Sequence, residues 1–125
     1  MKLRLQANSI RLRLKRGEVA QFVQEGWVEE KIVFGHDQAL RYRLEISFDA
    51  KVLQATFRAG EIFVEVPTEM ASHWASSDEV GIEAIQPAGE QAGLHILIEK
   101  DFACLNGPEE QNVDTFPNPL AGKLC

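Results

Sequence analysis

The sequence lacks any long apolar run, and it has no segment typical of a secretion signal. Its apolar runs are only a few residues long, whereas a helix that crosses a bilayer needs about 18 or more apolar residues. The first four residues, Met1 to Arg4, alternate between apolar and charged types, which excludes the continuous apolar segment of a signal peptide. We therefore expect a cytoplasmic protein with no membrane association.

Cysteine is scarce, and the residue patterns of common catalytic and cofactor sites are missing. The two cysteines, Cys104 and Cys125, are much further apart than paired zinc ligands, which usually have about two to four residues between them. In a protein that is not exported, both thiols should be reduced. The sequence also has no glycine-rich phosphate loop and no His-x-x-x-His pair. These absences predict a protein that is not an enzyme and binds no cofactor.

Basic residues are outnumbered 13 to 19 by acidic residues, which gives a net charge of −6 and disfavours a nucleic-acid partner. The exception is the first 16 residues, which hold six basic residues and no acidic one. A candidate anion- or partner-binding cluster consists of Arg11, Arg13, Lys15 and Arg16. Alternatively, these side chains lie on the solvent face of a strand and pair across the sheet with acidic neighbours such as Glu61 and Glu65.

The two halves of the chain have similar patterns. Leu3–Leu14 aligns without a gap with Ala55–Val66, and each segment is followed by a helical pattern and two further strand-like segments. Such an internal repeat predicts two ββαββ units. We expect one domain, 1–125, composed of a first unit at 1–49, a second at 50–100 and a loop-rich C-terminal cap at 101–125. The predicted fold is mainly β, a closed or nearly closed barrel of about eight short strands with two short helices near its ends.

Apolar alternation and helical spacing predict the individual elements. The alternation changes phase across Asn8-Ser9, which predicts a hairpin turn there, and Gly60 occupies the equivalent position in the second half. The predicted elements are a hairpin over 3–14, a helix over 18–25, strands over 27–34, 40–48, 52–58 and 61–66, a helix after Pro67, and strands over 80–86 and 94–99. The residues expected to form the apolar faces of the helices are Val19, Phe22, Val23, Met70 and Trp74.

The C-terminal cap has a different composition from the two repeat units. Asn106-Gly107-Pro108 and Phe116-Pro117-Asn118-Pro119 disfavour regular structure. The cap nevertheless carries large apolar residues that we expect to pack onto the barrel, namely Phe102, Leu105, Phe116 and Leu120. We therefore predict that the cap has a structural role.

The second unit resembles the swapped-hairpin, or cradle-loop, module of AbrB/SpoVT-like transition-state regulators and MazE-type antitoxins. The matching features are Gly60 in the hairpin turn, the strand Ile62–Val66 followed by Pro67, Glu69 at the start of the helix, and the closing hairpin over 80–99. In that family two chains exchange hairpins to form one barrel, and many members bind DNA through it. The resemblance implies that this chain holds two copies and forms a single-chain pseudo-dimer.

The match departs from the DNA-binding members of that family in its charge. Those members typically carry a basic residue after the turn glycine, but this chain has Glu61 there, followed by Glu65. Phosphate neutralisation supplies most non-specific DNA affinity, and the second unit has little beyond Arg58 to provide it. A DNA-binding regulator is therefore an alternative that the topology favours and the charge opposes.

The two ends of the chain resemble a second family. The opening Met1–Leu14 and the ending Lys100–Pro119 are similar to those of a family of uncharacterised bacterial proteins. That family has no established activity, so the resemblance implies none for this chain.

A further alternative is a small metal-binding protein built on the C-terminal cap. The candidate ligands, which combine thiol, imidazole and carboxylate groups, are His95, Cys104, Asp114 and Cys125. Cys104 lies between Ala103 and Leu105, however, which is typical of a small buried apolar residue. We therefore predict a non-catalytic, monomeric module that binds an unidentified protein or small molecule.

Overall fold

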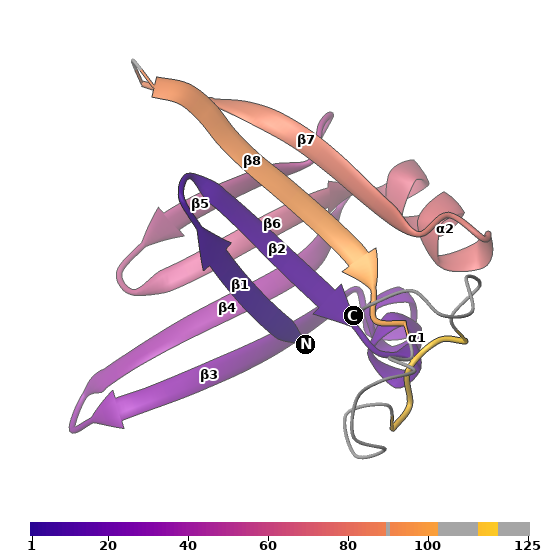
Figure 1. The fold of residues 1–125 in the computed structure, drawn as a ribbon, viewed down its shortest axis with the longest axis horizontal. Coiled ribbons are helices and arrows are strands. Elements are labelled where there is room, and N and C mark those ends of the chain that lie inside the picture. Colours follow the sequence, from indigo (N-terminus) through magenta and orange to yellow (C-terminus); the bar gives the residue numbers. More distant parts are fainter. Residues whose placement is uncertain (90, 103–112, 118–125) are drawn as a thin grey trace.

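The computed structural model describes residues 1–89, 91–102 and 113–117, apart from the side chain of Gln91. The described chain is mainly β, with eight strands and two helices in the predicted order (Figure 1). The elements are β1 (Lys2–Gln6), β2 (Ser9–Leu14), α1 (Arg16–Glu25), β3 (Trp27–Gly35), β4 (Gln38–Ser47), β5 (Gln54–Arg58), β6 (Glu61–Pro67), α2 (Thr68–Ser76), β7 (Gly81–Ala88) and β8 (Gln91–Lys100).

Local sequence accounts for the turns and helix ends. The first hairpin turns at Ala7-Asn8, one residue earlier than predicted, because Ser9 already pairs with Gln6 in the ladder. The turn between β5 and β6 uses Ala59 and Gly60, both at positive φ, as a tight two-residue hairpin requires. Helix α1 ends at Glu25 and is capped by Gly26, whose left-handed backbone conformation lets its N–H donate to the carbonyl of Phe22.

The strands form two four-stranded sheets. The order in the first is β1-β2-β8-β7 and in the second β3-β4-β6-β5, each with one parallel pair at its centre, β2 with β8 and β4 with β6. A closed barrel was predicted, but no backbone ladder joins the two sheets within the described residues. Between β5 and β7, the side-chain amide of Gln86 bonds the backbone of Ala55 in place of a ladder. On the other side of the fold, the hydroxyl of Tyr42 donates to the carbonyl of Met1.

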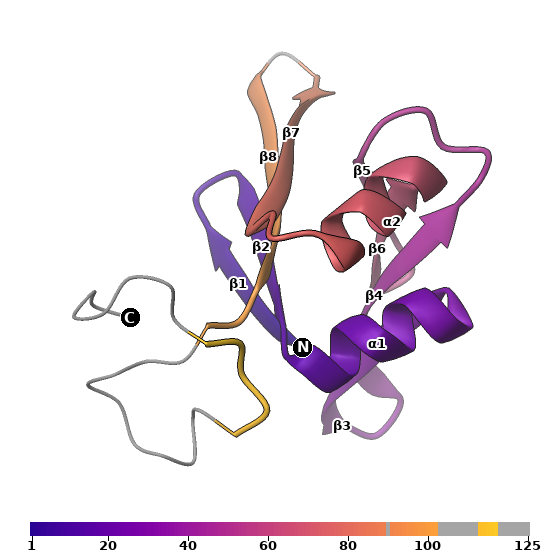
Figure 2. The ribbon, with the colours of Figure 1, turned by 90° about the vertical axis from the view of Figure 1, so that its right-hand side faces the viewer.

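Both helices lie at one end of the sheets, and the hairpin turns lie at the other end (Figures 1 and 2). The helices contact each other through Phe22 and Trp74, whose ring centroids are 6.1 Å apart in an edge-on arrangement. The largest fully buried side chains are Trp74, Phe22, Leu12, Leu14, Leu44, Leu53, Ile96, Ile98, Val64 and Val66. The core is therefore formed by the inner faces of both sheets and closed at one end by the helices.

The helix faces differ from the prediction at two positions. Val19, Phe22 and Trp74 are buried as expected, but Val23 is 51% exposed. In α2 the fully buried neighbour of Trp74 is Ala71, and Met70 is only partly buried. An isolated helix pattern shows an apolar stripe, but the helix's rotation against the sheets decides which edge of that stripe faces solvent.

The described part of the C-terminal cap lies against the end of β2 and the start of α1. Phe116 packs against the core, and its N–H donates to the carbonyl of Asp101, whose own N–H donates to the carbonyl of Leu14. The predicted cap contacts of Leu105 and Leu120 fall outside the described residues. In the part of the chain that the structure covers, we find no helix with the length and apolar character needed to span a membrane.

Candidate functional site

An apolar groove lies between the two sheets, towards the ends that carry the hairpin turns. Its volume is about 480 Å³, and we call it the sheet groove. Its lining residues are Leu5, Ile10, Leu40, Ala55, Thr56, Phe57, Ile62, Gln86 and Leu94. Nearly all are apolar, so the groove suits an apolar ligand group better than a charged one.

The sheet groove exists because the inward-facing apolar positions extend beyond the helices. Along β2, Ile10, Leu12 and Leu14 alternate on one face, but only Leu12 and Leu14 lie deep in the core. Nearer the hairpin turns no described helix covers the sheets, and Leu5 and Phe57 remain 57% and 69% exposed. Such exposed apolar side chains next to a groove are typical of interaction sites.

Gln86 is the main polar residue of the sheet groove. Its Nε2 donates to the carbonyl of Ala55 at 2.9 Å, and its Oε1 accepts from the N–H of Ala55 at 2.8 Å. Both ends of the amide are therefore satisfied, and the side chain links the edge of β7 to the edge of β5. The groove holds no charged side chain that could act as an acid, a base or a nucleophile.

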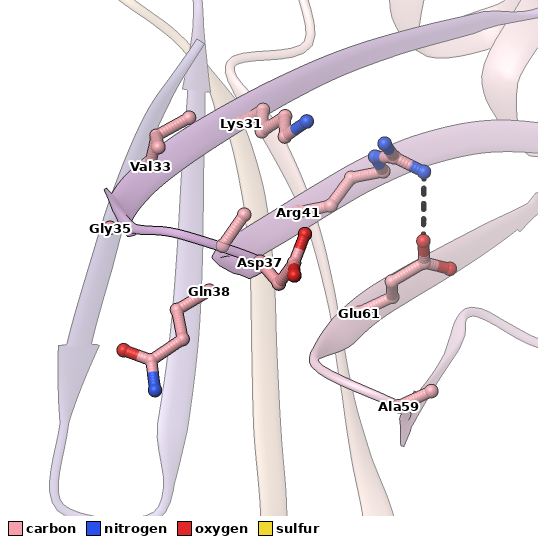
Figure 3. A pocket seen from close by; sticks show the side chains of 9 residues that line it. Lys31, Val33, Gly35, Asp37, Gln38, Arg41, Ala59 and Glu61 are labelled. Carbon is pink, nitrogen blue, oxygen red and sulfur yellow. Dashed lines mark hydrogen bonds and ion pairs between the residues drawn. The ribbon is translucent and has the colours of Figure 1, made fainter.

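A second pocket, of about 390 Å³, lies beside the turns after β3 and β5 and has a polar lining (Figure 3). Arg41 reaches across it to Glu61, with Nη1 2.8 Å from Oε1, and Lys31 and Asp37 flank the pair. The nearest further carboxylate, Glu29, has Oε1 3.7 Å from Nε of Arg41. Because positive and negative side chains are mixed and partly paired, this pocket shows no preference for one sign of ligand charge.

A third pocket, the helix groove, lies between α1 and α2 and has a volume of about 490 Å³. Its lining residues are Arg16, Val19, Ala20, Val23, Gln24, Ser72, Ala75, Ser76 and Phe116. Its lining mixes polar and apolar side chains and includes a charged one, so it is a weaker candidate for an apolar ligand than the sheet groove.

The structure divides the predicted basic cluster among different roles. Arg11 and Arg13 both pair with the same carboxylate oxygen of Glu99, and Arg13 Nε lies 2.8 Å from it. The backbone N–H of Lys15 donates to Glu18, and that of Arg16 donates to the carbonyl of Asp114. Glu99 is therefore the acidic partner of the two arginines, because β8 and not β6 lies beside β2.

Glu61 and Glu65, the partners suggested by the sequence, lie in the other sheet. Glu61 pairs with Arg41 of the neighbouring strand β4, and Glu65 lies 3.5 Å from the amide of Gln54. Cross-strand pairing with an acidic side chain is thus observed for Arg11 and Arg13, but the partner is Glu99 rather than Glu61 or Glu65.

The predicted metal ligands that can be placed are far apart. His95 is exposed, pairs in the ladder with Ser9, and has Nε2 2.9 Å from a carboxylate oxygen of Glu83. Asp114 lies at the other end of β2, where its Oδ2 accepts from the N–H of Gly17 at 3.0 Å. The strand between them spans about 16 Å, so the two residues do not share a site. Cys104 and Cys125 fall outside the described residues, and the described ones contain no cluster of three potential ligands.

The hydroxyl of Tyr42 has a shifted pKa. Burial raises the pKa of its hydroxyl above the ordinary value, and the nearby carboxylates of Glu30 and Glu18 raise it further. The hydroxyl donates to the carbonyl of Met1 at 2.8 Å. A protonated phenol in this position supports the contact between β4 and the start of the chain.

Together these features define a mainly β protein with two four-stranded sheets, two helices at one end and an apolar groove at the other. The chain belongs to DUF7009, a family of unknown function, whose model matches residues 1–120. A search of curated proteins found no significant match. No solved structure matched significantly either.

Proposed function

We propose that this protein is a non-catalytic binding module and that the sheet groove is its ligand site. The observation that supports this most is an apolar groove of about 480 Å³ with Leu5 and Phe57 exposed at its mouth. Ligand pockets typically enclose about 300–1,000 Å³ and are lined mainly by apolar side chains. Burying such a surface against a ligand releases about 25 cal/mol for each Å² of apolar area.

We also infer that the two halves are diverged copies of one swapped-hairpin unit. The strand order supports this, because the first hairpin of each half lies beside the second hairpin of the other half. Leu5 and Phe57 occupy equivalent positions in the aligned halves, as do Ile10 and Ile62, and all four line the sheet groove. The groove would then lie where the two copies meet. One chain supplies both copies, so we propose that it acts as a monomer.

DNA binding is the weaker proposal. Arg11 and Arg13 would have to contact phosphate, and both already pair with Glu99. Because these two arginines are already neutralised by Glu99, their binding to DNA would release few counterions from the phosphates. Any DNA binding should therefore be weak and should disappear as the salt concentration is raised.

A fluorescent apolar probe, anilinonaphthalene sulfonate, tests the proposed site. We expect the folded protein to bind it and Phe57→Asp to lose that binding, because the substitution places a charge at the mouth of the groove. Phe48→Asp is the matched control, since Phe48 is 88% exposed and does not line the groove. Equal probe binding by both variants would contradict the assignment of the site.

A further inference from the structure

Strand β5 is an edge strand, and alternate residues along it direct their backbone groups away from β6. Both backbone groups of Ala55 bond the amide of Gln86, so they point outward from the sheet. In an antiparallel ladder outward-facing and inward-facing residues alternate, so the N–H and carbonyl of Phe57 also point outward. No residue in the described ranges hydrogen-bonds these two groups of Phe57.

Gln86 occupies the position that a neighbouring strand would take. A primary amide offers the same N–H donor and carbonyl acceptor as a peptide group, and Gln86 makes both bonds to Ala55 at 2.8 and 2.9 Å. A ladder places strands about 4.8 Å apart. One glutamine side chain lies between β7 and β5 at this point, and residues of the two strands come within 8 Å Cα to Cα, so an added strand also requires β7 to shift away from β5.

The sheet groove adjoins this open edge. Phe57, Ile62 and Leu94 line the groove beside the outward-facing backbone of β5. In an added strand, successive side chains would point alternately into the groove and towards solvent. The site therefore combines backbone hydrogen bonds with an apolar pocket, the two elements of peptide recognition by strand addition.

We propose that the ligand of the sheet groove is an extended peptide segment of a partner protein that adds to β5, displaces the Gln86 amide and places alternate apolar side chains in the groove. This inference rests on the proposed binding function. The peptide bonds the backbone of Ala55 and Phe57, and Gln86 acts as an internal competitor that covers Ala55 when no peptide is bound.

The first experiment selects peptides from a random dodecapeptide display library against the full chain. We expect the enriched sequences to carry apolar residues at alternate positions. N-methylation of a single peptide nitrogen that faces β5 should abolish binding, whereas methylation of the next nitrogen should not. A library that yields no binder, or binders that tolerate N-methylation at every position, would overturn the proposal.

The second experiment removes the competitor. Gln86→Ala should bind the selected peptide about tenfold more tightly, because two hydrogen bonds no longer have to be exchanged. Gln54→Ala is the matched control on β5, since the amide of Gln54 lies beside Glu65 rather than at the open edge. The affinity of this variant for the peptide should equal that of the unmodified chain. Circular dichroism and the amide NMR spectrum show that both variants are folded. Weaker or unchanged peptide binding by Gln86→Ala would contradict the displacement of Gln86.

The two proposals can fail separately. If the naphthalene probe binds the groove and Phe57→Asp abolishes that binding, but no peptide adds to β5, the groove is an apolar site and strand addition is wrong. If neither the probe nor any peptide binds, both the proposed function and this inference are wrong.

Discussion

Replacing Trp74 with alanine should lower the melting temperature by about 12–20 °C. Trp74 is completely buried, contacts Phe22 across the two helices, and its Nε1 donates to the carbonyl of Val80 at 3.2 Å. Truncating a buried aromatic side chain to alanine typically costs about 3–5 kcal/mol. For a domain of this size, 1 kcal/mol corresponds to about 4 °C.

The matched control is Trp27→Ala, measured in the same thermal melts followed by circular dichroism. Trp27 is only partly buried, and its main specific contact is Arg43, whose guanidinium carbon lies 4.4 Å from the ring centroid. An exposed cation–π contact contributes only about 0.5–1 kcal/mol, so the shift should be less than half that of Trp74→Ala. A Trp74→Ala protein that melts within about 4 °C of the unmodified chain would refute a core shared by helices and sheets.

Four further outcomes follow from the contacts described. Tyr42, the only tyrosine, should ionise above its ordinary pKa in a near-ultraviolet absorbance titration. Because the unfolded chain loses this proton first, stability should fall as the pH rises through the ordinary tyrosine pKa of about 10, and a lower pKa in the folded protein would contradict this. Glu99→Gln should strengthen duplex DNA binding at low salt by freeing Arg11 and Arg13, and unchanged affinity would show that the pairing does not limit binding. Phe116→Ala should lower the melting temperature if the cap stabilises the core, and an unchanged melt would exclude that role. Light scattering should give the mass of one chain, and an obligate dimer would contradict the proposed monomer.

The sequence predicted the elements well because most of them have clear periodicity and turn residues. The main difference is the last hairpin, where a loop was expected over 87–93 but the strands extend to Ala88 and resume at Gln91. Pro87 is tolerated within β7 because β7 is an edge strand, on which a missing N–H need not interrupt a ladder, and because the pairing with β8 is irregular between Gln86 and Ala88.

Barrel closure and the candidate site depend on arrangements that the sequence pattern does not contain. Alternation shows that Leu5 and Phe57 face inward, as Leu12 does, but it does not show where the helices cease to cover the sheets. The partner of Arg11 and Arg13 was also misplaced, because the pairing of β2 with β8 joins residues almost 90 positions apart. The alignment of Leu5 with Phe57 in the two similar halves of the sequence was the available signal for the groove.

The most direct test of the sheet groove as the binding site is amide chemical-shift mapping on the isotope-labelled protein during titration with anilinonaphthalene sulfonate. The account predicts that the shifts concentrate at Leu5, Phe57 and Leu94, which line the groove on three different strands. Shifts confined to Val23 and Ala75 in the helix groove would contradict it.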